Sequence, residues 1–110
     1  MKLPNPHQAV VEIDKLREYC LSRVHPRGRH KARVFEERLV ISAEHAERLQ
    51  GALLEAAYNN EVIEGISDAY GRRYMIDLEV TGPSGRAMIR SAWIIRVNEE
   101  FPCFVTCYVL

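Results

Sequence analysis

The spacing of apolar residues changes once along the chain, from a helical period to an alternating one. In the first half, apolar residues such as Ile13, Leu16 and Cys20 recur every three or four positions, as on a helix with one buried face. Ser42 has the side chain of a helix N-cap. Two more stripes of this kind follow the first, through Ala32, Phe35 and Leu39 and through Ala46, Leu49, Leu53 and Ala57. The first half therefore predicts three helices.

The second half predicts strands. Apolar and polar residues alternate from Tyr74 to Val80, and again on a return strand that ends near Val97. Residues 82–85, Gly-Pro-Ser-Gly, predict a four-residue hairpin loop in which Gly85 is free to adopt a positive φ. A weaker strand is expected over 62–66, and a last one from Cys103 to about Val109.

Helices followed by strands in an antiparallel meander predict an α+β fold. We expect about three N-terminal helices to pack on one face of a sheet of about four strands. The chain of 110 residues corresponds to one domain, 1–110. Its 47% hydrophobic and 27% charged residues are typical of globular proteins and exclude disordered, collagen-like and coiled-coil classes.

The lengths of the apolar runs and the spacing of the cysteines indicate where the protein is located and what state its thiols are in. The longest apolar runs, such as 92–95, are too short to cross a membrane, and the N-terminus does not resemble a signal peptide, so we expect a cytoplasmic protein. Cys103 and Cys107 are four apart on one predicted strand, hence on one face and too distant for a disulfide. With Cys20, they are interpreted as buried hydrophobes. No metal-ligand spacing occurs, and no metal or cofactor is expected.

Basic residues gather in residues 23–33. This segment has five of the 15 Lys and Arg residues, two of the four histidines and no acid. Because it leads into a predicted helix, free backbone N–H groups and the helix dipole would add to its positive potential. Arg27, Gly28 and Arg29 are therefore candidates for binding phosphate. The alternative is a solvated helix face.

Helical geometry separates the two strongest candidates in this segment from the rest. With Ala32 and Phe35 buried, Lys31 lies at the edge of the apolar stripe, whereas His30 points away from the core. Lys31 can thus reach along the sheet, and it is selected together with His25; His30 is a secondary candidate. Either residue alone is also compatible with an ordinary surface role.

The charged sheet face is a second candidate site. Arg90 is central in its predicted strand and would either pair with Asp77 and Glu79 across strands or bind an anion. Thr106 and Tyr108 could add hydroxyl groups. These residue types suit the cleavage of RNA by its own 2′-hydroxyl, with His25 transferring protons, Lys31 and an Arg holding the phosphate, and Thr106 or Tyr108 orienting it.

Several short motifs together resemble a bacterial domain family of unknown function. They are His25-Pro26-x-Gly28-x-x-Lys31-Ala32-x-x-Phe35, Tyr70-Gly71-x-Arg73-Tyr74, Thr81-Gly82-Pro83-x-Gly85-Arg86, Trp93 and Val105-Thr106-x-Tyr108. Such domains occur alone and at the C-termini of polymorphic-toxin or phage-derived proteins, and their architecture is similar to that of barnase and RelE-type ribonuclease toxins. The family usually has a glycine-containing turn after the second helix, whereas here residues 37–41 continue directly to Ser42.

The residues and the resemblance together suggest two classes of function, beside a purely structural alternative in which Gly28 and Lys31 only pack and cap the second helix. The first is a metal-independent ribonuclease, with His25, Lys31, Thr106 and Tyr108 as catalytic residues and Arg73 and Arg90 added to the phosphate-binding set. Its partners would be RNA and an inhibitor protein. The second is a non-catalytic module that binds an anionic ligand or a protein, such as an operon partner. The last strand offers an edge for such pairing or for a homodimer.

Overall fold

The computed structural model describes residues 1–110 and confirms an α+β fold with a single four-stranded antiparallel sheet. Its helical elements are η1 (Pro6–Gln8), α1 (Ile13–Lys15), η2 (Leu16–Cys20), α2 (Arg29–Leu39), η3 (Ala43–His45) and α3 (Ala46–Asn59). The strands β1 (Ile63–Asp68), β2 (Gly71–Gly82), β3 (Gly85–Arg96) and β4 (Cys103–Val109) pair in chain order. None of the helices has the length and hydrophobicity that a membrane crossing needs.

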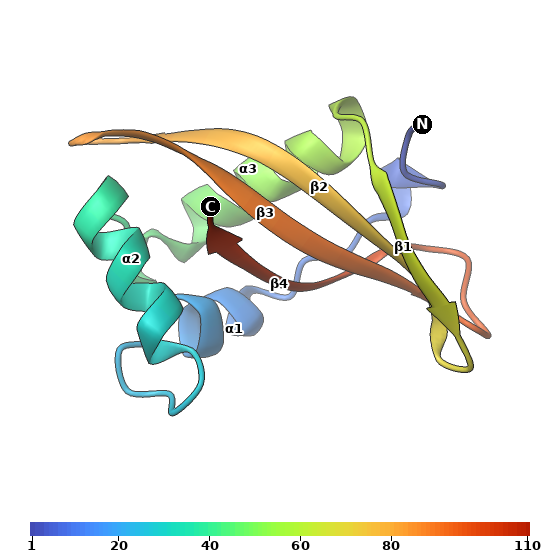
Figure 1. Cartoon of the computed structure of the whole chain (residues 1–110), viewed down its shortest axis with the longest axis horizontal. Coiled ribbons are helices and arrows are strands. Elements are labelled where there is room, and N and C mark those ends of the chain that lie inside the picture. Colours follow the sequence, from blue (N-terminus) through green and yellow to red (C-terminus); the bar gives the residue numbers. More distant parts are fainter.

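The three predicted helical regions all form on one side of the sheet. The first is α1 continued by η2, a single π-helical turn; the second is α2; and the third is α3, preceded by the short η3 with Ser42 at its N-cap. In Figure 1, α3 lies behind β2 and β3, while α1 and α2 lie near β4 at one end of the sheet. The opposite face of the sheet, here called the outer face, has no helix over it.

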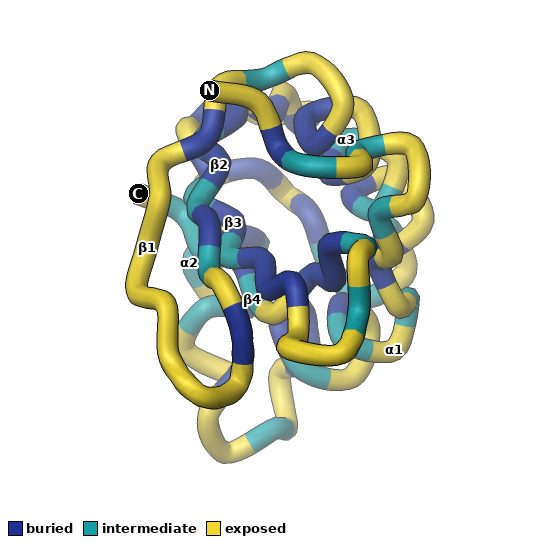
Figure 2. Tube along the Cα trace, turned by 90° about the vertical axis from the view of Figure 1, so that its right-hand side faces the viewer, coloured by how far each residue is buried: buried dark blue, intermediate teal, exposed yellow.

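The alternation of the two long strands decides which residues enter the core. On β2 and β3, side chains such as Ile76, Ile89 and Trp93 face the helices and are buried. The intervening residues, among them Asp77 and Arg90, lie on the outer face. Figure 2 shows the buried part of the chain between the helices and the sheet, with β1 exposed along its whole length. The core therefore lies in one layer.

Two local predictions for the strands are wrong. Gly82 pairs with Gly85, so the hairpin loop has two residues, Pro83 and Ser84, instead of four; Gly85 does adopt a positive φ of 148°. The expectation that Cys103 and Cys107 share one face also fails. A bulge in β4 makes Cys103 pair with Ile94 and Cys107 with Ser91, whose side chains point to opposite faces. All three cysteines are free and buried, as predicted.

The last strand is an edge of the sheet, as predicted, but part of that edge is covered. Val10 forms a parallel bridge with Cys103, and the Phe104 N–H donates to the Val10 carbonyl at 2.9 Å. The Lys15 ammonium donates to the Phe104 carbonyl, also at 2.9 Å. The backbone hydrogen-bonding groups at the start of β4 therefore have partners within the chain. Only the C-terminal part of β4 is left for pairing with another strand.

Candidate functional site

Five side chains from three elements converge beside the C-terminal half of β4. Tyr19 and Cys20 end η2, Lys31 lies in the first turn of α2, and Thr106 and Tyr108 belong to β4. We call these five residues the Lys31 cluster. They are far apart in the chain, and it is the packing of η2 and α2 against β4 that brings them together.

Lys31 is the centre of this cluster. Its ammonium donates hydrogen bonds to the Thr106 hydroxyl at 3.1 Å and to the Tyr19 hydroxyl at 3.3 Å. The same nitrogen lies 5.0 Å from the centre of the Tyr19 ring and 5.8 Å from that of Tyr108, which is cation–π range. No carboxylate pairs with it. Its positive charge is held in a defined place with no carboxylate to pair with it, so it can attract an anion.

Gly28 allows α2 to begin this close to η2. A Cβ atom at this position would lie 1.9 Å from the carbonyl oxygen of Tyr19. The φ of −79° and ψ of −25° at Gly28 are accessible to any residue, so the need for glycine is one of space rather than of conformation. The sequence led us to expect that Gly28 binds phosphate; in the structure its evident contribution is to set the distance between Tyr19 and Lys31.

His25 holds the turn that precedes α2. Its Nδ1 accepts hydrogen bonds from the backbone N–H groups of Arg27 and Gly28, both at 3.0 Å, and the backbone N–H of His25 donates to the Ser22 hydroxyl. Its ring meets that of Tyr19 edge to face, with 4.7 Å between their centres. Since Nδ1 is occupied as an acceptor, the neutral ring has its proton on Nε2. His25 can thus donate a hydrogen bond from Nε2, but it is badly placed to accept a proton.

Cys20 lies below the Thr106 side chain of the Lys31 cluster, where it is fully buried. Its Sγ is 3.6 Å from the Thr106 hydroxyl oxygen. The pKa of Cys20 is lowered to about 6, chiefly by a hydrogen bond from the Cys107 side chain. Thr106, the Cys107 backbone and the charge of Lys31 lower this pKa further, whereas burial raises it. The same hydrogen bond and burial raise the pKa of Cys107.

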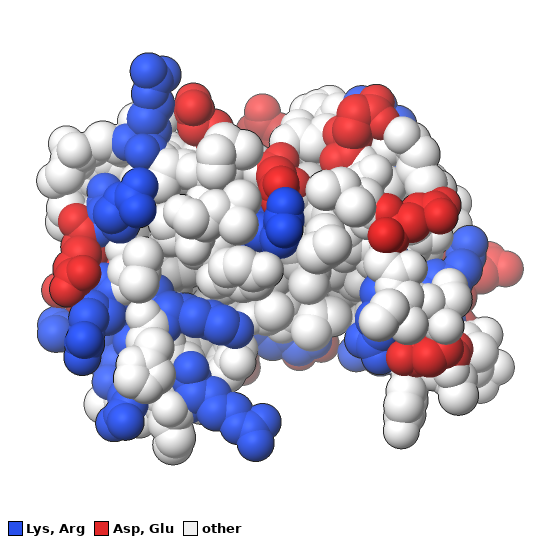
Figure 3. All heavy atoms as spheres, in the orientation of Figure 1, with Lys and Arg blue, Asp and Glu red and all other residues white.

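The remaining predicted phosphate ligands divide between two places. Arg27 and Arg29 are exposed beside the Lys31 cluster, and Figure 3 shows basic side chains gathered over α2 and the loop before it. Arg90 lies on the outer face, one strand from Tyr108, and is already bound to Asp77 through two hydrogen bonds of 2.8 and 2.9 Å. These bonds raise the pKa of Arg90 and lower that of Asp77. The cross-strand pairing predicted as an alternative therefore occurs.

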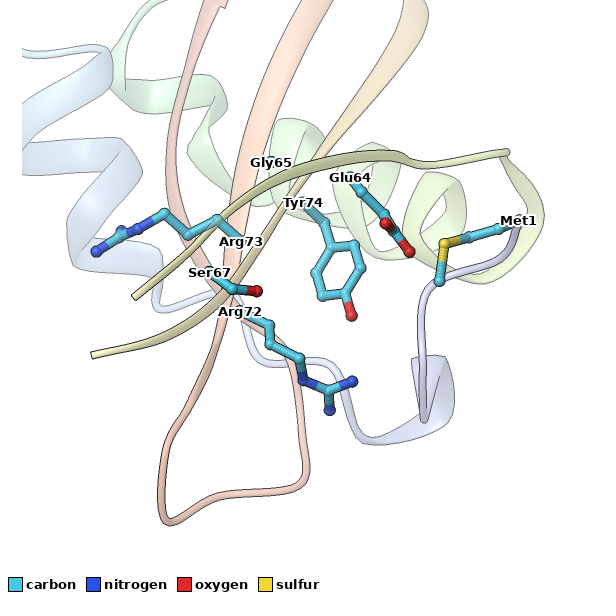
Figure 4. Close-up of a pocket in the computed structure, with 7 residues that line it drawn as sticks. All are labelled: Met1, Glu64, Gly65, Ser67, Arg72, Arg73 and Tyr74. Atoms are coloured by element: carbon cyan, nitrogen blue, oxygen red, sulfur yellow. The ribbon is translucent and has the colours of Figure 1, made fainter. Parts of the chain in front are cut away.

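Arg73 lies away from the Lys31 cluster. Its guanidinium is 3.3 Å from the Asp68 carboxylate, at the β1–β2 end of the sheet. Figure 4 shows one pocket of about 200 Å³ that Arg73 lines together with Arg72, Tyr74 and four other residues; the Arg73 side chain extends away from those of Arg72 and Tyr74. Arg73 also lines a second, more apolar hollow on the outer face.

Sequence reasoning missed Tyr19 and Cys20 as members of the site. Cys20 belongs to the apolar stripe of the first helical region, where packing explains it sufficiently, and Tyr19 directly precedes it. The signal that was available is the position of Tyr19 at the end of its helix, a few residues before the basic segment. No group of three or more His, Cys, Asp or Glu side chains gathers anywhere as a metal site would require.

Comparison with known families and structures identifies the chain. A model described as "Domain of unknown function (DUF6883)" matches residues 2–110. The protein belongs to this family. None of the curated proteins matches the sequence. Among solved structures, a chain of the contact-dependent growth inhibition toxin–immunity protein complex from Klebsiella pneumoniae 342 is similar, with a TM-score of 0.69 and 18% identity. The similarity covers 92% of this DUF6883 domain and 99% of that chain, and it shows a shared fold.

Proposed function

We propose that this DUF6883 domain is a ribonuclease that cleaves RNA through attack of the 2′-hydroxyl on the adjacent phosphate, without a metal ion. The observation that carries the proposal is the Lys31 ammonium, which two hydroxyls and two aromatic rings hold in place while no carboxylate neutralises it. The basic segment beside it supplies the long-range attraction for RNA. The fold that the domain shares with a chain of a toxin–immunity complex is compatible with this function.

The proposed reaction uses residues of the Lys31 cluster in distinct roles. The O2′–P bond forms and the P–O5′ bond breaks through a phosphorane, and Lys31 stabilises its negative oxygens. The Tyr19 hydroxyl accepts a hydrogen bond from Lys31, so its own proton is directed elsewhere and can pass to the departing O5′. Thr106 and Tyr108 orient the phosphate. Hydroxide takes the proton of the 2′-hydroxyl and becomes water, because the Nδ1 of His25 is occupied. The tyrosinate left at Tyr19 regains its proton from the solvent.

Cleavage of total RNA in EDTA tests this proposal. Wild-type protein should leave 2′,3′-cyclic phosphate ends. Lys31→Met, which keeps an unbranched side chain one atom shorter and removes its charge, should cleave about 10²- to 10³-fold more slowly, the usual cost of losing one such stabilising donor. Arg38→Met, on an exposed face of the same helix, is the matched control and should cleave like wild type. Intact RNA with the wild-type protein would refute the proposal.

The pH dependence separates the proposed role of His25 from that of a general base. With hydroxide as the acceptor, the rate should rise with pH, whereas a histidine base paired with an acid gives a bell-shaped profile. His25→Ala should weaken the turn before α2 and lower the rate without changing the form of this profile. A profile that changes form in this variant would assign proton transfer to His25.

A binding module without catalysis is the second candidate, and the outer face favours it. Apolar side chains such as Ile66, Met88 and Val105 are exposed there, and a partner protein could cover them. An operon partner, an inhibitor or a second copy pairing with the free part of β4 would each increase the mass of the domain in light scattering. A complex with a partner, together with uncleaved RNA, would favour this function over the ribonuclease.

A further inference from the structure

A hollow on the outer face begins one residue from the Lys31 cluster. Ile66 of β1, Met75 of β2, Ala92 of β3 and Val105 of β4 line it, so all four strands contribute. Val105 precedes Thr106 in the chain, and Ala92 pairs directly with Thr106 across the strands. A ligand bound to the Lys31 ammonium can therefore extend into this hollow without leaving the sheet.

Both irregularities of the sheet lie at the border of this hollow. The register between β1 and β2 shifts between Glu64 and Ser67, which leaves Gly65 and Ile66 without regular partners. The register between β3 and β4 shifts at Ala92 and Trp93, which leaves Val105 as the extra residue. Bulges of this kind redirect side chains and are common beside active sites. Here they place Ile66 and Val105 on opposite sides of one depression.

The chemistry of the hollow suits a flat, mostly apolar ring with polar edges. Its walls are mostly apolar side chains, and Arg73 also lines it, with its guanidinium 3.3 Å from the Asp68 carboxylate. Its volume of about 270 Å³ is below the range of about 300–1,000 Å³ that drug-sized ligands occupy. A single nucleobase fits these requirements, since bases stack on apolar and guanidinium groups without regard to sequence.

We infer that this hollow binds the base of a nucleotide adjacent to the phosphate held by Lys31. This inference rests on the proposed function, and it assigns single-stranded RNA as the substrate, because a base paired in a duplex is not free to enter. Arg73, which was expected to bind phosphate, then contacts the base instead.

Binding of small ligands tests the base site separately from catalysis. Titrations followed by NMR would compare nucleoside 3′-monophosphates with ribose 5-phosphate and inorganic phosphate. We expect all three to shift signals of Lys31 and Thr106, and the nucleotides alone to shift those of Ile66 and Val105. The base should strengthen binding about 10-fold, within the range measured for stacking of one base.

Two variants and a matched control make the assignment specific. Ala92→Phe fills the hollow and should remove the 10-fold advantage of the nucleotides while leaving the affinity for ribose 5-phosphate unchanged. Met88→Phe places the same side chain on the same face of β3, away from the hollow, and should bind like wild type. Ile66→Ser changes an exposed residue, 73% accessible, and should weaken nucleotide binding without affecting folding.

The outcomes distinguish the two hypotheses. If wild-type protein binds ribose 5-phosphate and nucleotides equally well, the base site is refuted and the ribonuclease proposal stands. If nucleotides keep their advantage in Ala92→Phe, the base binds elsewhere and the inference is wrong. If no phosphate ligand binds and RNA is not cleaved, the proposed function is refuted and the base site fails with it.

Discussion

Gly28→Ala tests whether the Lys31 cluster depends on the close contact between α2 and η2. The added Cβ would lie 1.9 Å from the Tyr19 carbonyl oxygen, where ordinary contact begins at 3.4 Å, so the two backbones must separate by about 1.5 Å. Neither atom belongs to a flexible side chain that could move aside. Overpacking of this kind costs about 1–3 kcal/mol, and we expect the upper end, about 3 kcal/mol.

Urea denaturation measures this cost directly. With a slope of about 2 kcal/mol per molar urea, the midpoint of unfolding should fall by about 1.5 M. Gly51→Ala is the matched control. Position 51 is an exposed site within α3 with no atom within 4 Å of the new Cβ, and the better helix propensity of alanine should stabilise the protein by about 1 kcal/mol. The same substitution should therefore have opposite effects at the two sites.

The activity of the Gly28→Ala variant provides a second measurement. Separation of η2 from α2 would move Tyr19 away from Lys31, which now donates to it at 3.3 Å. RNA cleavage in EDTA should decrease even at urea concentrations where the variant is fully folded. A Gly28→Ala protein as stable as wild type, within about 0.5 kcal/mol, would refute the contact and the account of the site built on it.

Three further predictions concern stability. Val40 ends α2 at a φ of 55°, which costs a β-branched residue about 1–2 kcal/mol, so Val40→Asn should raise the midpoint of thermal unfolding by about 4 °C or more. The buried Ser91 hydroxyl donates to the Ile76 carbonyl at 2.8 Å and accepts from the Trp93 indole at 2.9 Å. Ser91→Ala should therefore destabilise the protein by about 1–3 kcal/mol in urea denaturation, and an unchanged midpoint would contradict these two hydrogen bonds. The pKa of Cys20, about 6 in the fold against an ordinary 9.0, means that ionised Cys20 stabilises the fold fully above pH 9 and loses this effect as the pH falls towards 6. The difference in unfolding free energy between wild type and Cys20→Ser should therefore shrink over that interval, and a constant difference would refute the shift.

The sequence alone was sufficient for the order and type of the elements. Helical and alternating periods are set by which side chains must be buried, and this requirement acts within each segment. Ala32, Phe35 and Leu39 are buried on α2 as predicted, and Ile76 and Ile89 on the sheet. The position of Lys31 at the edge of its helix also followed from the period, since the angle between two residues of a helix depends only on their separation.

What sequence reasoning missed depends on contacts between segments. The bulge at Val105 puts Cys103 and Cys107 on opposite faces of the sheet, because an extra residue in one strand shifts the pairing of the residues beyond it. The pairing of Tyr19 with Lys31, the occupied Nδ1 of His25 and the distance between Arg73 and the other candidates are likewise properties of packing. Periodicity could place Lys31 and Thr106 on their elements. Only the tertiary structure decided that they meet, because a 3.1 Å contact between residues 75 apart depends on how η2, α2 and β4 pack together.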